Sequence, residues 1–413
     1  MRYCKRCLYN ELHPLNLVID SEGICSGCRI HEEKDKLDWG KRGQILGDIL
    51  SNYRNSTGNN YDCIIPVSGA RDSYFIVDTI KNVYGMNPLL VTYNKHYNTD
   101  VGIRNLANLR IKFDCDIMTL TVNPETVKKI TRSTFRRFGS IYWHCLAGQT
   151  VYPVQMAVKL KIPLIIWGVH QGIDQVGMFS HTDEVEMTRK YRKEHDLMGY
   201  EAEDLVDLNF DNLTTDDLRP YFYPDDKEIE HVGVRGIYLN NYVRWDSRAQ
   251  HEDMIKKFQF ESLSQTRTFD SYNDVDCWNY SDIHDYIKLV KWGYGKVLDH
   301  SCREIRLRRM TREEGIKQVS KYIFNKPAYL DLFLEWIGIT ENAFHFILDQ
   351  HRNKIFWRRN TQWEWEFLQD ILSFGTKSDD LDQAGVFSEF KITPVGVSTD
   401  NSNNYILIGK GYS

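Results

Sequence analysis

Long apolar runs are absent from this sequence. None approaches the ~20 apolar residues that a membrane-spanning helix needs, and no apolar stretch of a signal peptide follows the basic start "MRYCKRC". We therefore expect a cytoplasmic protein with no membrane insertion. A large excess of one charge is also missing, because the formal net charge is −5 over 413 residues. This balance argues against indiscriminate nucleic-acid binding, and we expect no nucleic-acid partner.

Cysteine pairs occur only near the start of the chain. Of the nine cysteines, four form the pairs Cys4-x2-Cys7 and Cys25-x2-Cys28, and the other five are scattered singly. Close pairs in a long cytosolic chain are typical of a metal site; unrelated thiols or a disulfide pair are the alternatives. Four thiolates hold zinc tetrahedrally and leave no open position for catalysis. We therefore predict a structural Zn²⁺ on Cys4, Cys7, Cys25 and Cys28, in a zinc ribbon of residues 1–32.

Strand-like and helix-like patterns alternate through the middle of the chain. After a linking region, 33–60, with a helix from about Glu32 to Tyr53, short apolar runs are separated by segments of helical periodicity. This alternation is typical of a doubly wound, mostly parallel α/β sheet with helices on both faces, here over 61–245. The region 246–413 is mainly helical and aromatic-rich in pattern, and we assign it to substrate or partner binding. The strands are expected within 62–67, 88–94, 116–122, 163–169 and 236–243, and the helices within 71–84, 99–113, 125–138 and 146–160.

A short polar loop follows the first expected strand, in the sequence "PVSGARDSYF". It lacks the Gly-Lys-Ser/Thr ending of a P-loop and the G-x-G-x-x-G pattern of a dinucleotide site, so neither class is favoured. A strand, a small loop and a helix start together form a geometry that binds phosphate. The backbone N–H groups and the hydroxyls of Ser68 and Ser73 could bind one anion there, and Arg71 adds charged donors. A purely structural turn is the alternative.

Four features of the chain together resemble one enzyme family: the N-terminal Cys pairs, "SGARDSYF", "IIWGVHQG" and "WGYGKVLDHSCREIRLRRMTREEGI". The loop resembles the SGGxDS signature of the PP-loop ATP pyrophosphatases, which have a HUP-like fold and cleave ATP to AMP and pyrophosphate. Over residues 1 to about 350 the chain is similar to their N-acetyl sugar amidotransferase branch. Members convert an acetamido group on an acidic sugar of bacterial lipopolysaccharide, O-antigen or flagellin glycans into an acetamidino group.

The resemblance implies ATP and Mg²⁺ as cofactors and ammonia as a second substrate. ATP adenylates the amide oxygen and releases pyrophosphate, and ammonia then displaces AMP. Because Cys145 beside His144 does not define a glutaminase dyad, a separate glutaminase subunit is implied, with or without an ammonia-channelling subunit. The implied catalytic residues are Ser68, Arg71 and Asp72. The implied nucleotide-binding residues are Ser68, Gly69, Ala70, Asp72 and Ser73 in the loop, Thr92, Tyr93 and Asn94 after the second strand, and Gly168.

A run of cations lies in the segment from Lys291 to Arg312. A solvated helix face is the ordinary interpretation of such a run. The family's sugars carry a carboxylate, however, and arginine suits planar bidentate carboxylate binding. The resemblance therefore favours recognition of the acidic sugar by Lys296, Arg303, Arg306 and Arg309.

Two other functions stay open. A PP-loop tRNA-thiolating enzyme would need a catalytic cysteine pair and a basic surface, and only Cys145 lies in a plausible loop. A non-catalytic zinc-ribbon protein that binds nucleotide or nucleic acid is favoured only by Ala70, which stands where the family has glycine. Alanine is harmless there at negative φ and costs about 1–2 kcal/mol at positive φ. We expect the loop to tolerate it.

Overall fold

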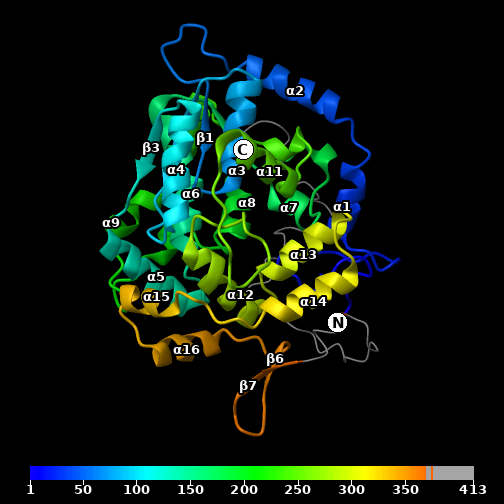
Figure 1. Cartoon of the computed structure of the whole chain (residues 1–413). Helices are drawn as coiled ribbons and strands as arrows, with labels where there is room; N and C mark the ends of the chain where they lie inside the picture. Colours follow the sequence, from blue (N-terminus) through cyan, green and yellow to red (C-terminus); the bar gives the residue numbers. More distant parts are fainter. Residues whose placement is uncertain (369–373, 375–413) are drawn as a thin grey trace, which may run out of the picture.

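A parallel five-stranded sheet is the framework of residues 63–238, and its strands β1 and β3 are labelled in Figure 1. The computed structural model describes residues 1–368 and Phe374. The sheet order is β3-β2-β1-β4-β5, and all neighbouring strands are parallel. Because the order reverses between β1 and β4, a crevice is expected at the carboxyl ends of these two strands, where ligands bind in such folds. The strands are β1 (Cys63–Pro66), β2 (Pro88–Tyr93), β3 (Ile117–Leu120), β4 (Leu164–Trp167) and β5 (Arg235–Tyr238).

Helices cover both faces of this sheet. Ile64 of β1 packs on one face in a cluster with Val154 of α6. The next residue, Ile65, packs on the opposite face in a cluster with Leu109 of α4, because successive strand residues point to opposite faces. The predicted doubly wound α/β sheet is confirmed. The covering helices are α3 (Arg71–Val77, continued by a π-helix, Asp78–Val83), α4 (Asp100–Phe113), α5 (Pro124–Phe138), α6 (Trp143–Leu160), α10 (Asp226–Val232) and α11 (Ser247–Phe258).

Local capping explains where these helices begin and end. The Thr99 side chain accepts a hydrogen bond from the backbone N–H of Gly102 at the start of α4, as a helix N-cap does. Asn123 caps α5, with Pro124 at the first helical position, and Gly139 ends that helix in a left-handed conformation. The helices predicted over 99–113 and 125–138 are therefore confirmed to within one residue at each end.

The N-terminal segment contains two helices where the sequence predicted one. They are α1 (Ser26–Lys34) and α2 (Trp39–Ser51). The prediction of a single helix from about Glu32 to Tyr53 is therefore wrong. Asp38 caps α2 by accepting a hydrogen bond from the backbone N–H of Lys41, and such a cap starts a new helix instead of continuing the preceding one.

The C-terminal region is mainly helical over its described part, as predicted. Residues 369–373 and 375–413 of the predicted region lie outside the described residues. A small antiparallel hairpin of β6 and β7, which the sequence pattern did not predict, projects from the helices (Figure 1). The elements are α12 (Asp285–Trp292), α13 (Lys296–Arg306), α14 (Arg312–Tyr322), α15 (Leu330–Ile337), α16 (Glu341–Gln350), β6 (Trp357–Arg359) and β7 (Trp365–Phe367).

Short helical turns connect the larger elements between β4 and β5. They include α7 (Gln171–Asp174), α8 (Arg189–Tyr191), which runs into a π-helix (Arg192–Asp196), and α9 (Thr215–Leu218). Within residues 1–368 and at Phe374, no helix combines the length and the apolar character needed to cross a membrane.

Candidate functional site

The polar loop at residues 68–73 joins the carboxyl end of β1 to the first turn of α3. Ala70 is the N-cap of α3, with φ −93° and ψ 162°, an extended conformation that any L-residue adopts. Alanine therefore causes no backbone strain at this position. Gly69 is different, because a Cβ there would lie 2.2 Å from the carbonyl oxygen of Gly102 in α4. The loop requires glycine at position 69 and tolerates a side chain at position 70.

Hydrogen bonds hold this loop in shape and tie it to distant parts of the chain. The Ser73 hydroxyl accepts from the backbone N–H of Ser68, at 2.7 Å, and each serine still has its own O–H to donate to an anion. Arg71 is buried. Its guanidinium donates to the carbonyl oxygen of Ser247 and to Oδ1 of Asn273, each at 3.0 Å. Arg71 thus anchors the loop to the C-terminal region.

A cavity, here called cavity A, lies beside the loop and the end of β2. Ser68 and Gly69 line it from the loop, and 92–94 line it from the strand end, together with residues of α4. Five of the predicted nucleotide-binding residues therefore meet in one cavity. The Tyr93 hydroxyl lies in a buried network, 2.9 Å from Nδ1 of His144 and 2.7 Å from the hydroxyl of Tyr221. The five predicted nucleotide-binding residues that line cavity A are Ser68, Gly69, Thr92, Tyr93 and Asn94.

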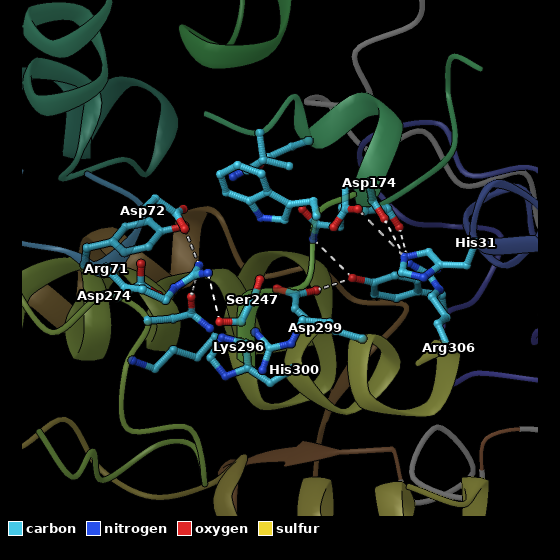
Figure 2. A pocket seen from close by; sticks show the side chains of 18 of the residues that line it. His31, Arg71, Asp72, Asp174, Ser247, Asp274, Lys296, Asp299, His300 and Arg306 are labelled. Atoms are coloured by element: carbon cyan, nitrogen blue, oxygen red, sulfur yellow. Dashed lines mark hydrogen bonds and ion pairs between the residues drawn. The ribbon is translucent and has the colours of Figure 1, made fainter. Parts of the chain in front are cut away.

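A second cavity, cavity B, adjoins the same loop (Figure 2). Arg71 and Asp72 line it from the loop, and three of the four predicted substrate cations line it from α13. Arg309 is not among the lining residues, and its guanidinium pairs with the carboxylates of Asp246 and Glu304. The loop therefore lines cavity A with its first residues and cavity B with the next ones. The three predicted substrate cations that line cavity B are Lys296, Arg303 and Arg306.

Buried charges in cavity B differ in how they are compensated. The guanidinium of Arg303 lies 2.7 Å from the carboxylate of Asp270. The ammonium of Lys296 donates to the side-chain amide oxygen of Gln265, and burial lowers the pKa of Lys296. Burial also raises the pKa of Asp274 to about 6. The hydrogen-bond acceptor of Lys296 is thus neutral, although the nearby carboxylates of Asp274, Asp285 and Asp282 offset part of the effect of burial on its pKa.

The four cysteines near the N-terminus form one buried cluster. Their sulfur atoms all lie within 4.8 Å of one another, with Cys4 and Cys28 3.9 Å apart and Cys7 and Cys25 3.5 Å apart. A tetrahedron with Zn–S bonds of about 2.3 Å has sulfur atoms about 3.8 Å apart. The cluster therefore could hold zinc in the predicted geometry. The guanidinium of Arg306 donates toward Cys25 Sγ at 3.5 Å and offsets part of the thiolate charge.

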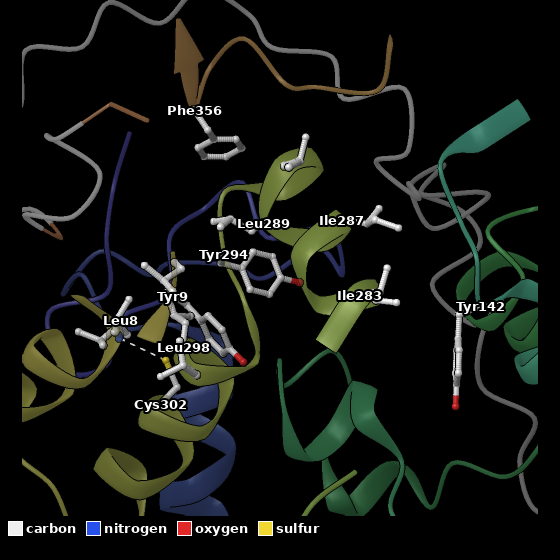
Figure 3. Close-up of a cluster of buried hydrophobic side chains, with 14 of the residues drawn as sticks. Leu8, Tyr9, Tyr142, Ile283, Ile287, Leu289, Tyr294, Leu298, Cys302 and Phe356 are labelled. Atoms are coloured by element: carbon white, nitrogen blue, oxygen red, sulfur yellow. Dashed lines mark hydrogen bonds between the residues drawn. The ribbon is translucent and has the colours of Figure 1, made fainter. Parts of the chain in front are cut away.

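The N-terminal segment packs directly against the helices that form cavity B (Figure 3). The backbone N–H of Leu8 donates to the sulfur of Cys302 in α13, at 3.4 Å. The hydroxyl of Tyr9 donates to Oδ1 of Asp299, also in α13, at 2.7 Å, and both residues line cavity B. The ribbon region therefore supplies part of the wall of that cavity.

Gly168, the last predicted nucleotide-binding residue, follows β4. A Cβ at this position would lie 2.9 Å from Cδ1 of Ile76 in α3 and 3.4 Å from the Trp245 ring. Close packing thus accounts for the glycine. Gly168 is not among the residues that line cavities A and B, and its approach to a nucleotide stays a prediction.

Lys95 and Asp276 line cavity A but are absent from the predicted site. Their ammonium and carboxylate groups lie 2.7 Å apart and are buried. Burial alone would lower the pKa of Lys95. The nearby carboxylate of Asp276 raises this pKa, and the net result is a raised pKa. Lys95 follows the end of β2 by two residues, and this position at a strand's carboxyl end is a signal that could have identified it. Asp276 carries no such signal.

Residues 254–372 match the family described as "LPS biosynthesis protein WbpG-like, C-terminal domain". An uncharacterized protein of Methanocaldococcus jannaschii is 26% identical over 117 residues, which cover 28% of this chain and 42% of that protein. The match thus spans less than half of that relative's length. Among solved structures, NMN synthetase from Francisella tularensis aligns with 13% identity and a TM-score of 0.27, over 55% of this chain and 98% of that chain. The C-terminal part of the chain is therefore similar to a domain of lipopolysaccharide biosynthesis proteins.

Proposed function

We propose that this chain is an ATP-dependent amidotransferase that converts the acetamido group of an acidic bacterial surface sugar into an acetamidino group. The observation that carries the proposal is the loop shared by two cavities. A nucleotide in cavity A would direct its phosphates to the loop, and an acceptor in cavity B would meet them at Asp72. The similarity of residues 254–372 to a lipopolysaccharide biosynthesis domain supports a surface sugar as the acceptor.

The chemistry consists of two displacements. The amide oxygen of the acceptor attacks the α-phosphorus of ATP, and pyrophosphate leaves with its charge stabilised by the backbone N–H groups and hydroxyls of the loop. Ammonia then attacks the activated carbon, and AMP leaves with the former amide oxygen. The carboxylate of Asp72 is an oxygen ligand of the kind that Mg²⁺ prefers. When bound there, Mg²⁺ would neutralise phosphate charge.

Recognition of an acidic sugar would fall to the cations of α13. Arg303 offers a planar guanidinium for a carboxylate, and Lys296 offers a buried ammonium whose hydrogen-bond acceptor is an amide. Arg306 is engaged with Cys25 and with the carbonyl oxygen of Gln175. We therefore assign carboxylate binding to Lys296 and Arg303, and a structural contact with the cysteine cluster to Arg306.

The proposal is tested by mass spectrometry of acidic N-acetylated sugars incubated with the protein, Mg-ATP and ammonium. Conversion of C=O to C=NH lowers the sugar mass by about one unit, and AMP should form in equal amount. Ser68→Ala and Asp72→Ala should each lower AMP formation by about 100-fold or more, because a loop donor or the charge beside it is lost.

Asp48→Ala, at an exposed carboxylate on α2, is the matched control and should keep full activity. Unchanged turnover in both loop variants would remove the loop from the reaction. AMP formation without a change in sugar mass would assign the chain to another adenylating reaction.

Burial of Cys145 argues against tRNA thiolation. Its thiol is fully buried, and burial raises the pKa of Cys145 well above its usual value, so the reactive thiolate is disfavoured. No cysteine is among the described residues that line cavity A or cavity B. The remaining alternative, a non-catalytic nucleotide-binding protein, predicts no AMP formation and is excluded by any turnover in the mass experiment.

Ammonium salts, but not glutamine, should support AMP formation by the isolated chain. A glutaminase needs an activated nucleophile beside a base, and the thiol of Cys145 next to His144 is buried and protonated. A separate glutaminase subunit should make glutamine an effective donor when it is added. The measurement compares AMP release with ammonium chloride, with glutamine, and with glutamine plus a glutaminase. Efficient turnover by the pure chain with glutamine alone would contradict this prediction.

A further inference from the structure

A third cavity, cavity C, lies at the carboxyl ends of β4 and β5. Trp167 and Tyr238, the last residues of these strands, both line it. Val169 and Gln171 line both cavity C and cavity B, so the two cavities share a wall. The functional residues described so far lie outside cavity C, yet it directly adjoins the cavity where the acceptor would react.

Cavity C contains a buried histidine that lacks hydrogen bonds. His170 is 1% exposed, and neither ring nitrogen has a hydrogen-bond partner among the described residues. Burial lowers the pKa of His170 to about 3, so the ring is neutral and has one nitrogen that accepts a hydrogen bond. Buried polar atoms without partners are rare in folded proteins. A ligand that donates N–H or O–H would satisfy this nitrogen.

One carboxylate, that of Asp196, and one guanidinium, that of Arg192, line cavity C. The guanidinium of Arg192 lies 2.6 Å from the carboxylate of Glu201, which is outside the lining of the cavity and also lies 3.9 Å from the guanidinium of Arg189. Asp196 has no ion pair with any described residue. The ammonium of Lys291, which lines the next cavity together with Asp196, donates to the carbonyl oxygens of Phe138 and Gly139. Asp196 can therefore accept a proton or a cation.

Three aromatic rings form part of the remaining wall of cavity C, beside the aliphatic side chains of Leu146, Val169 and Met187 and the polar side chains of Gln149, Thr150, Gln171 and Thr188. The rings of Trp167, Tyr191 and Tyr238 line it, and ring faces attract cations electrostatically. Asp196 is the one carboxylate among the described residues that line this cavity, whereas Ca²⁺ sites commonly combine several carboxylates with other oxygen ligands. A carboxylate, a neutral imidazole nitrogen and aromatic rings together suit a monovalent cation that donates hydrogen bonds.

We propose that cavity C binds ammonium and delivers ammonia to cavity B. This proposal rests on the proposed function and names the place where its nitrogen donor binds. One N–H bond of ammonium breaks, and an O–H bond forms on Asp196. The ammonia that results keeps the electron pair needed to attack the activated carbon, and it reaches cavity B past Val169 and Gln171. Burial supports this transfer, because it raises the pKa of Asp196 to about 7.

A direct test uses thallium(I), a monovalent cation close to ammonium in size, in crystals of the full chain. We expect an anomalous density peak in cavity C of the parent protein, and its loss in Asp196→Asn. Glu203→Gln, at an exposed carboxylate seven residues further along the same connection between β4 and β5, is the matched control and should keep the peak. A parent crystal without a peak in cavity C, or a peak that persists in Asp196→Asn, would overturn the proposal.

Kinetics provide a second readout. Asp196→Asn should raise the KM for ammonium at least tenfold while the KM for ATP stays within about twofold, because the nucleotide cavity is left intact. Equal changes in both constants would show a general structural role and would count against the site. Thallium binding needs no turnover. Absence of thallium from cavity C would therefore count against the ammonium site alone, whereas absence of AMP formation would count against the proposed function.

Discussion

Gly69→Ala is expected to lower the rate of AMP formation by about 100-fold or more. A Cβ at position 69 would lie 2.2 Å from the carbonyl oxygen of Gly102 and 2.9 Å from its Cα. Neither backbone atom can rotate away. Gly102 is itself held in place, because a Cβ built on it would lie only 2.5 Å from the Cα of Asp276. The loop must therefore shift away from α4 and lose its fit to the phosphates. The measurement is the rate of AMP release at saturating ATP.

The neighbouring substitution Ala70→Gly is the matched control. Because Ala70 has an extended backbone with φ −93°, removal of its methyl group relieves no strain, and ATP affinity and AMP release should stay within about threefold of the parent. A gain of more than tenfold, about 1.4 kcal/mol, would show that the alanine impairs the loop. Normal activity in Gly69→Ala would show that the close contact with α4 is not required.

Removal of one zinc ligand is the second change with a large expected effect. Cys25→Ser should lower the zinc content from one per chain to well below half. Structural zinc contributes about 10–16 kcal/mol of apparent binding energy in small zinc modules, comparable to the whole stability of a typical domain. The N-terminal segment should therefore unfold at a lower temperature. Elemental analysis and thermal unfolding measure the two effects.

AMP formation should fall in the same variant, because Tyr9 of the N-terminal segment lines cavity B. Cys115→Ser replaces a half-buried cysteine that is not part of the cluster and should leave zinc content and activity unchanged. A parent protein without zinc, or Cys25→Ser with normal metal content and stability, would contradict the assignment of the cluster as a zinc site.

The sheet and its helices could be predicted because they depend on residues close together in the sequence. Ile64 and Ile65 lie in one apolar run, and the run is buried on both faces of the sheet. The Thr99 cap marks the start of α4 within three residues. The cysteine pairs are equally local signals, and the structure brings all four sulfur atoms together.

The composition of the cavities could not be predicted, because it depends on long-range packing. Lys95 meets Asp276, 181 residues further along, and no periodicity links such positions. The cations near α13 were predicted as one group, yet they separate in the structure. Arg308 follows the end of α13 with φ 60°, and this left-handed residue lies between the helix and Arg309. A pattern of charges in the sequence contains no information on such a turn.

The anchor between Arg71 and Asn273 also constrains when the site can exist during protein synthesis. The two residues are 202 positions apart, and translation at about 5–20 residues per second separates them by about 10–40 s. During this interval the sheet can form on the ribosome, but α13 and its part of cavity B have not yet been synthesised. Asp276 of cavity A is also synthesised after this interval, so both cavities are completed only as the last third of the chain emerges.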